Sequence, residues 1–156
     1  MSTLMTDSSS ETVEAANPDQ FELLIHLRWG DMDSLAHVNN VQVARLFEEA
    51  RVRAFAEWFG ARRENISMLV ARQDIEYHSP LAYTPEPVRI FGRVSRIGTA
   101  SFQFGYTLVD PAGTTCAVAQ TTLVVIDAET GRPTPIPDPI RAILEEHHGA
   151  PVKFRH

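Results

Sequence analysis

The sequence has very little cysteine and almost no lysine. Cys116 is the only cysteine among 156 residues, so a disulfide within the chain is impossible and no cysteine cluster can hold zinc. We therefore expect a reducing, cytoplasmic location. Lys153 is the only lysine, and arginine supplies the other basic side chains. Because the guanidinium group is a planar fork that matches phosphate oxygens, a local phosphate site stays open to this sequence.

Long apolar runs are also missing. No apolar stretch reaches the roughly 18 residues that a membrane-spanning helix needs. The first twenty residues have neither the basic region nor the apolar segment of a secretory signal. We therefore expect no membrane partner and no secretion. Apolar residues make up 44% and charged residues 22% of the chain, which is typical of a soluble globular domain.

Negative charge is concentrated at the beginning of the chain. Four of the six net negative charges come from carboxylates in the first twenty residues, which contain no lysine or arginine. The rest is close to neutral, so we expect no nucleic-acid partner. Residues 1–18 are rich in serine, threonine and acidic side chains and are predicted to be a disordered tail. Residues 19–156 are long enough for one domain and too few for two.

One long amphipathic helix is the strongest secondary-structure signal. Apolar residues recur every three or four positions from Val43 to Trp58, which predicts a helix over about residues 40–59. The charged residues between them, Arg51 included, are expected on its exposed surface. Capping residues stand at both ends: Asn39, Asn40 and Gly60.

Strand patterns surround this helix. Apolar and polar side chains alternate over residues 21–29, which is the period of a strand. Short turns separate the later strands, and short connectors join antiparallel neighbours. The later strands are predicted at about 67–78, 87–97, 100–110 and 114–127, with a short helix at 138–147. A single sheet must bury one face, so the sequence predicts an α+β domain with a curved antiparallel sheet wrapped around one long central helix.

Two carboxylates, a histidine and two amides stand between the first strand and the long helix, within residues 28–40. The first turn of a helix has unpaired N–H groups and a partial positive charge, which can bind a developing oxyanion. A nearby carboxylate such as Asp31 or Asp33 can act as a general base or a nucleophile. Hydrolysis by acyl transfer requires these two parts.

The same residues have other interpretations. Aspartate, asparagine and serine are ordinary in loops and helix caps, so the residue types alone leave a purely structural loop open. Asp31, Asp33 and His37 could also ligate a metal. Two carboxylates and one histidine without a further cluster are a weak metal pattern, and we predict no metal site.

The segment also resembles the 4-hydroxybenzoyl-CoA thioesterase-like family of hotdog-fold proteins. Members have the pattern R-x-x-D-x-D-x-x-G-H-V-N-N, followed by a long helix with F-E-x-A-R. The counterparts here are Arg28, Asp31, Asp33, residues 37–40 and residues 47–51. Weaker matches follow in the family's order, so the resemblance covers about residues 21–147. It implies the hotdog fold and acyl-CoA thioesterase activity.

The resemblance implies roles for individual residues. Asp33 takes the place of the catalytic carboxylate, as general base or nucleophile. The backbone N–H of Asn40, seven residues later, polarises the thioester carbonyl. His37 and Asn39 flank that site, either in catalysis or as loop scaffolding, and Asp31 fixes the loop. No separate cofactor is implied, because CoA is part of the substrate.

The chain departs from the family pattern at two places. Ala36 stands where many relatives have glycine, at a position that can need an unusual backbone angle. Some relatives bind the CoA phosphates with a basic run, but residues 98–100 here are Gly-Thr-Ala. Other basic residues are the candidates for this contact: Arg62, Arg63, Arg93, Arg96 and Lys153.

The predicted function is therefore hydrolysis of an acyl-CoA thioester by a homodimer or homotetramer. Family members assemble as dimers, often as dimers of dimers, and a single sheet has exposed edges that can pair. The alternatives are a non-catalytic acyl-CoA-binding module and an acyl-CoA hydratase or dehydratase, since fold does not determine chemistry. Glu48 and Glu49 on the long helix are the next candidates for the catalytic carboxylate.

Overall fold

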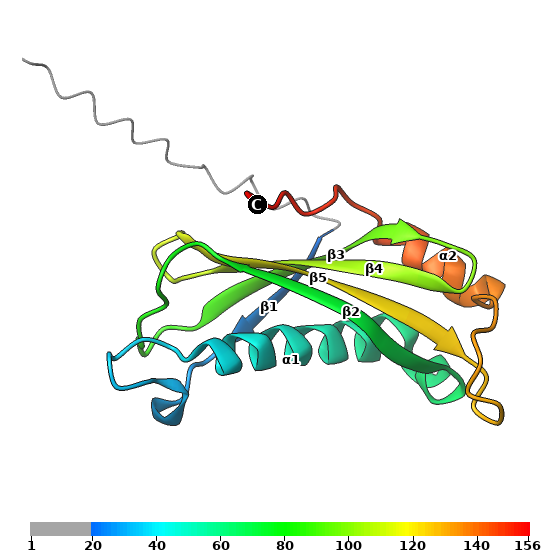
Figure 1. Ribbon diagram of the computed structural model, residues 1–156, viewed down its shortest axis with the longest axis horizontal. Helices are drawn as coiled ribbons and strands as arrows, with labels where there is room; N and C mark the ends of the chain where they lie inside the picture. Colours follow the sequence, from blue (N-terminus) through cyan, green and yellow to red (C-terminus); the bar gives the residue numbers. More distant parts are fainter. Residues whose placement is uncertain (1–19) are drawn as a thin grey trace, which may run out of the picture.

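A computed structural model describes residues 20–156, so the predicted tail at residues 1–18 lies outside the described residues. One antiparallel sheet and one long helix form the body of the described chain (Figure 1). The strands lie in the order β1-β3-β4-β5-β2. Their bounds are β1 Phe21–Ile25, β2 Ser67–Tyr77, β3 Val88–Ile97, β4 Ser101–Val109 and β5 Thr115–Ile126. The predicted α+β class, with an antiparallel sheet around a central helix, is confirmed.

The central helix α1 extends over Asn40–Phe59, as its apolar period predicted. Asn39 is the N-cap, and its side-chain oxygen accepts the N–H of Val41 at 2.9 Å. Gly60 follows the last turn with a φ of 53°, a backbone angle that glycine adopts without a Cβ clash. Both ends of α1 are therefore set by local residue chemistry.

Aromatic side chains fill the space between α1 and the sheet. Alternate residues of β4, among them Phe104 and Tyr106, point toward the helix and are fully buried. The rings of Phe47 on α1 and Tyr106 have centroids 5.1 Å apart, and those of Phe55 and Phe104 are 5.6 Å apart. Burial of each such side chain contributes about 1.5–3 kcal/mol relative to exposure. This packing holds α1 in place along the sheet.

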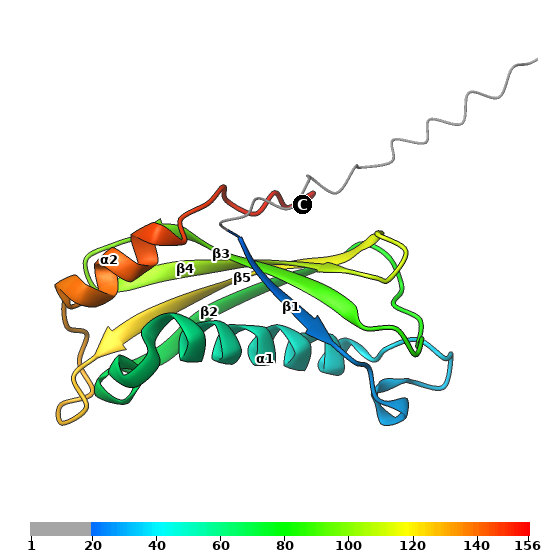
Figure 2. The same ribbon diagram turned by 180° about the vertical axis from the view of Figure 1, so that it is seen from behind.

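The chain after β5 covers part of the other side of the sheet. Helix α2, Asp138–Glu146, lies at the end of the sheet farthest from the loop that precedes α1 (Figures 1 and 2). The final residues cross the sheet face opposite α1, where Val152 packs directly against Gly105 of β4. A Cβ atom on Gly105 would lie only 2.7 Å from Val152, so this crossing depends on the glycine. Among the described residues, no helix is long and apolar enough to cross a membrane.

Two expectations from the sequence are wrong. The alternating pattern at residues 21–29 predicted one strand, but β1 ends at Ile25 and Trp29 begins the 3₁₀ turn η1, Trp29–Asp31, with its side chain 75% exposed. Arg51 is buried rather than exposed, because its position on α1 faces Tyr106, whose hydroxyl accepts a hydrogen bond from Arg51 Nη1 at 3.0 Å. The Tyr106 hydroxyl in turn donates to Thr121 Oγ1 at 3.1 Å.

Candidate active site

The loop before α1 folds back on itself around Asp33. Met32 and Val38 form an antiparallel bridge, and the N–H of Asp33 donates to the carbonyl of His37 at 2.7 Å. Ala36 closes this turn with a φ of 59°. The sequence predicted an unusual backbone angle at this position, and the structure confirms it. Alanine is strained in this left-handed region, so the conformation of Ala36 in the tight turn around Asp33 has a free-energy cost.

The carboxylate of Asp33 lies at the exposed surface of this loop. Its Oδ1 atom accepts the N–H of Leu35 at 2.9 Å and the N–H of His37 at 3.3 Å. No described residue donates a hydrogen bond to Oδ2. One oxygen therefore holds the turn together while the other remains available to a water molecule or a substrate.

The first N–H groups of α1 differ in how they are paired. The N–H of Val41 is bonded to the Asn39 side chain, and the N–H groups of Gln42 and Val43 donate to the Asn39 carbonyl. Within residues 20–156, the N–H of Asn40 has no hydrogen-bond acceptor. This group stands at the positive end of the α1 dipole, so it is suited to bind a negatively charged oxygen.

The other two predicted site residues have mainly backbone contacts. His37 accepts and donates through its main chain, and it forms a bridge with Ala82. Among the described residues, its imidazole has no hydrogen-bond partner. The side chain of Asn39 serves as the helix cap, as described above. The structure thus brings the four predicted residues Asp33, His37, Asn39 and Asn40 into one loop and helix start.

Asp31 differs from Asp33 because it is completely buried. Its carboxylate accepts hydrogen bonds from the backbone and side chain of Arg28 and from Arg45 Nη2, at 2.8–3.1 Å. Burial by itself would raise the pKa of Asp31. The hydrogen bonds from Arg28 and the charges of Arg45 and Arg28 outweigh burial and hold this pKa below its usual value of 3.8. Asp31 is therefore an ionised structural anchor of the loop, as the sequence interpretation expected.

The predicted phosphate-binding arginines are not next to Asp33 in the same chain. Arg62 and Arg63 belong to the 3₁₀ helix η2, Gly60–Asn65, which follows the far end of α1. A helix of 20 residues is about 30 Å long, so these two residues are about that far from the Asp33 loop. Arg96 lies near the end of β3, beside the same far end, and Arg93 lies on the sheet face opposite α1 with its Nε donating to the Ala150 carbonyl at 2.6 Å.

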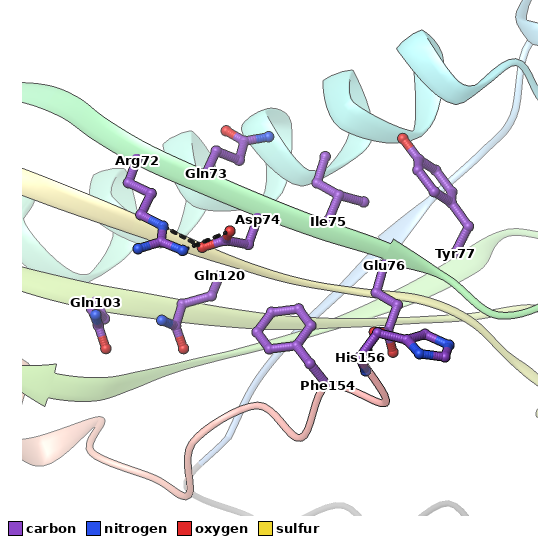
Figure 3. A pocket seen from close by; sticks show the side chains of 10 residues that line it. All are labelled: Arg72, Gln73, Asp74, Ile75, Glu76, Tyr77, Gln103, Gln120, Phe154 and His156. Carbon is purple, nitrogen blue, oxygen red and sulfur yellow. Dashed lines mark hydrogen bonds and ion pairs between the residues drawn. The ribbon is translucent and has the colours of Figure 1, made fainter.

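A groove of about 810 Å³ lies on the sheet face opposite α1 (Figure 3). Polar side chains of β2 line much of it, together with Phe154 and His156 near the end of the chain, whereas Ile75 and Tyr77 point toward α1. Glu76, at its edge, accepts the backbone N–H groups of Arg155 and His156 at 2.8–3.1 Å. The N–H of Arg155 is the main cause of a lowered pKa at Glu76, against the opposing effect of burial. None of the predicted site residues lines this groove.

Two contacts near the helix start were not expected from the sequence. The hydroxyl of Tyr77 donates to the carbonyl of Asn40 at 3.3 Å, and Arg45 reaches back from α1 to Asp31. Neither residue stands in the D-x-D block, and both contacts depend on how α1 lies against the sheet and the loop. Within the described residues, no group of three or more histidine, cysteine, aspartate or glutamate side chains could hold a metal ion.

The fold and the loop together define a protein of the hotdog class, with a carboxylate-bearing loop at the start of the central helix. The sequence model of the Thioesterase-like superfamily matches residues 27–144. The chain therefore belongs to the Thioesterase-like superfamily.

Comparison with individual proteins agrees with this assignment. The chain is similar to a predicted thioesterase from Bacillus stearothermophilus, with 30% identity, a TM-score of 0.75 and coverage of 85% of this chain and 99% of the other. It is also similar to a Thermus thermophilus thioesterase complexed with coenzyme A and Zn, with 28% identity, a TM-score of 0.72 and coverage of 83% and 95%. The uncharacterized protein YsmA of Bacillus subtilis (strain 168) is 26% identical over 110 residues, which are 69% of this chain and 74% of YsmA.

Proposed function

We propose that the protein is an acyl-CoA thioesterase, which hydrolyses an acyl-CoA thioester to a free carboxylic acid and coenzyme A. The unpartnered N–H of Asn40, at the start of α1 beside the Asp33 loop, is the observation that carries this proposal. Membership of the Thioesterase-like superfamily and the similarity to a thioesterase complexed with coenzyme A support it.

The N–H of Asn40 supplies electrostatic stabilisation in this mechanism. The carbonyl oxygen of the thioester accepts this N–H, and it becomes more negative as the carbonyl carbon is attacked. A donor that is already in place therefore stabilises the transition state more than the bound substrate. The Asn39 cap holds the first turn of α1 in the geometry that leaves this N–H open.

The Asp33 carboxylate supplies the chemical step. As a general base, it takes a proton from a water molecule whose oxygen attacks the carbonyl carbon, and the tetrahedral intermediate then expels the CoA thiolate, which takes up a proton. As a nucleophile, Asp33 forms an anhydride with the acyl group and releases the CoA thiolate, and water then hydrolyses the anhydride. The free Oδ2 atom is available for either route.

Release of free thiol from a panel of acyl-CoA substrates tests the activity. We expect thiol release with at least one acyl-CoA and saturation at increasing substrate concentration. A change in enoyl-CoA absorbance without thiol release would identify a hydratase or dehydratase instead. Saturable binding of acyl-CoA without any turnover would identify a binding module.

We also propose that the protein is a homodimer that pairs through β2. This strand has 11 residues and pairs with β5 on one side only, whereas the other edge strand, β1, has five. The exposed apolar residues Leu69 and Val70 lie on this open edge, and long apolar edge strands tend to pair with another strand.

This arrangement also brings basic residues to the Asp33 loop. Antiparallel pairing of two β2 strands about a two-fold axis makes the two α1 helices antiparallel. The end of one α1 helix then lies at the same end of the dimer as the start of the other. Arg62 and Arg63 of the partner subunit are thereby placed on the Asp33 side, where they could bind CoA phosphates.

A further inference from the structure

The buried carboxylate of Asp31 connects the Asp33 loop to the second turn of α1. Arg28, one of its two partners, lies three residues earlier in the same loop, and its own contact with α1 is long, from Nη2 to Gln42 Oε1 at 3.4 Å. Arg45 is the partner on α1, and its Nη2 atom donates to Asp31 Oδ1 at 3.1 Å. Within the described residues, Arg45 is the only side chain of α1 that contacts the Asp31 carboxylate.

The guanidinium of Arg45 is held in this direction by its own helix. Its Nε atom donates to Gln42 Oε1 at 2.7 Å, and its Nη1 atom lies 3.4 Å from Glu49 Oε2. These partners stand three residues before and four residues after Arg45, so they are on the same side of the helix. Three separate contacts therefore orient the fork, which leaves Nη2 aimed at the loop.

Asp31 also contacts the residue just before the proposed oxyanion site. Its backbone carbonyl accepts the N–H of Asn39 at 2.9 Å. Asp33 follows Asp31 by two residues, and Asn40 follows Asn39 by one. A shift of Asp31 relative to α1 would therefore change the distance between the Asp33 carboxylate and the Asn40 N–H.

We infer that Arg45 is a positioning residue for the proposed reaction: it sets the place of the Asp33 carboxylate relative to the start of α1 through Asp31. This inference rests on the proposed function. Arg45 itself touches neither the substrate nor the reacting atoms. Reacting groups must be aligned closely, and a misplacement of about 1 Å can cost on the order of 10²-fold in rate.

The first test compares Arg45→Gln with Arg53→Gln. Arg53 also lies on α1 and also pairs with Glu49, at 2.7 Å, but it does not contact the loop. Both changes remove one positive charge from the helix. We expect Arg45→Gln to lower kcat on the order of 10-fold to 10²-fold with little change in KM. Arg53→Gln should retain wild-type kcat, and equal losses in the two variants would overturn the inference.

A conservative variant guards against a general loss of folding. Arg45→Lys keeps a positive charge that can reach Asp31 but lacks the fork that bonds Gln42 and Glu49 at the same time. We expect it to recover part of the kcat lost in Arg45→Gln, while both variants unfold cooperatively in a thermal scan. A kcat in Arg45→Lys no higher than in Arg45→Gln, with both folded, would contradict positioning through the charge on Asp31.

Two further measurements separate this inference from the proposed function. Adding Arg45→Gln to Asp33→Asn should lower the residual kcat far less than it lowers wild-type kcat, because no carboxylate is left to align.

Amide hydrogen exchange at Asn39, which needs no substrate, should speed up in Arg45→Gln and not in Arg53→Gln. If Asp33→Asn were fully active, the proposed mechanism would fail, and the exchange rates would still decide whether Arg45 holds the loop to α1. Unchanged exchange at Asn39 in Arg45→Gln would overturn the inference by itself.

Discussion

At the scale of single residues, the two aspartates of the loop are in opposite environments. Asp31 is completely buried and forms ion pairs with two arginines, and these ion pairs hold the loop in place. Asp33 is exposed, and only one of its oxygens takes part in the turn. Two residues of the same type, separated by one position, are therefore suited to different tasks.

Asp33→Asn tests the proposed chemical role. The change keeps the size of the side chain and its Oδ1 acceptor, so the turn and the binding of substrate should persist. It removes the charge and most of the basicity. General-base catalysis is typically worth about 10²–10⁴-fold, so we expect kcat to fall by that factor with a modest change in KM. Near wild-type turnover in this variant would make Glu48 or Glu49 the next candidate.

Asp31→Asn should act mainly on stability. The loss of a buried, charge-assisted hydrogen-bond acceptor costs about 1–3 kcal/mol at neutral pH, and kcat should fall less than in Asp33→Asn. Because the pKa of Asp31 is lowered in the folded state, its contribution to stability is present above its usual pKa and is lost as the pH falls through the folded-state value. The difference in melting temperature between the wild type and Asp31→Asn should therefore shrink as the pH falls below the usual value of 3.8, as followed by thermal unfolding across pH.

Ala36→Gly should stabilise the protein. Alanine in the left-handed region costs about 1–2 kcal/mol, whereas the extra freedom of glycine in the unfolded chain costs about 0.5–1 kcal/mol. The net gain of up to about 1 kcal/mol corresponds to a rise of about 2–4 °C in melting temperature. Ala112→Gly is the control, because Ala112 lies in an exposed turn without a positive φ and should gain nothing. An equal rise in both variants would contradict strain at Ala36.

At the scale of elements, the start of α1 is the feature on which the proposed function depends most. Asn39 has a φ of −62° and a ψ of 142°, which is an extended conformation that a following proline accepts. Proline is also tolerated at the first helical position, because its missing N–H would have no partner within the helix. This helix start can therefore lose one N–H without losing its fold.

Asn40→Pro uses this property to test the oxyanion site. The variant should fold with a melting temperature close to that of the wild type and lose on the order of 10²–10³-fold in kcat, because the donor to the carbonyl oxygen is gone. Asn40→Ala removes the side chain and keeps the N–H, so it should lose far less. A steady-state comparison of the two variants isolates the backbone group. Equal activities would show that this N–H does not bind the oxyanion.

At the scale of the whole molecule, the two edges of the sheet differ in length and therefore in their capacity to pair. The double substitution Leu69→Lys and Val70→Lys on β2 should prevent this pairing. Neighbouring residues of a strand point to opposite faces of the sheet, so the open edge would carry a charge on each face. We expect a monomer in sedimentation and a large loss of thioesterase activity. Leu24→Lys on β1 is the matched control, because Leu24 is 56% exposed and Leu69 is 54% exposed. An active wild-type monomer at assay concentration would rule out a shared site.

The sequence by itself determined the features that depend on near neighbours. The apolar period and the caps at Asn39 and Gly60 defined α1, and the alternating patterns placed β2, β3, β4 and β5 within a residue or two of their observed bounds. The D-x-D block predicted the loop, and the departure at Ala36 predicted the strained angle that the structure contains. Each of these features follows from side chains only a few positions apart, whose interactions do not depend on the rest of the fold.

Only the tertiary structure decided which distant residues meet. The packing of α1 on the sheet buried Arg51 against Tyr106, 55 positions later, and the loop geometry brought Asp31 to Arg45. The length of α1 separated Arg62 and Arg63, which the sequence offered as candidates for the CoA phosphates, from Asp33 of the same chain. These contacts depend on the strand order and on the direction of the helix across the sheet. No period or motif in the sequence carries that information, because it arises when the elements pack to bury their apolar faces together.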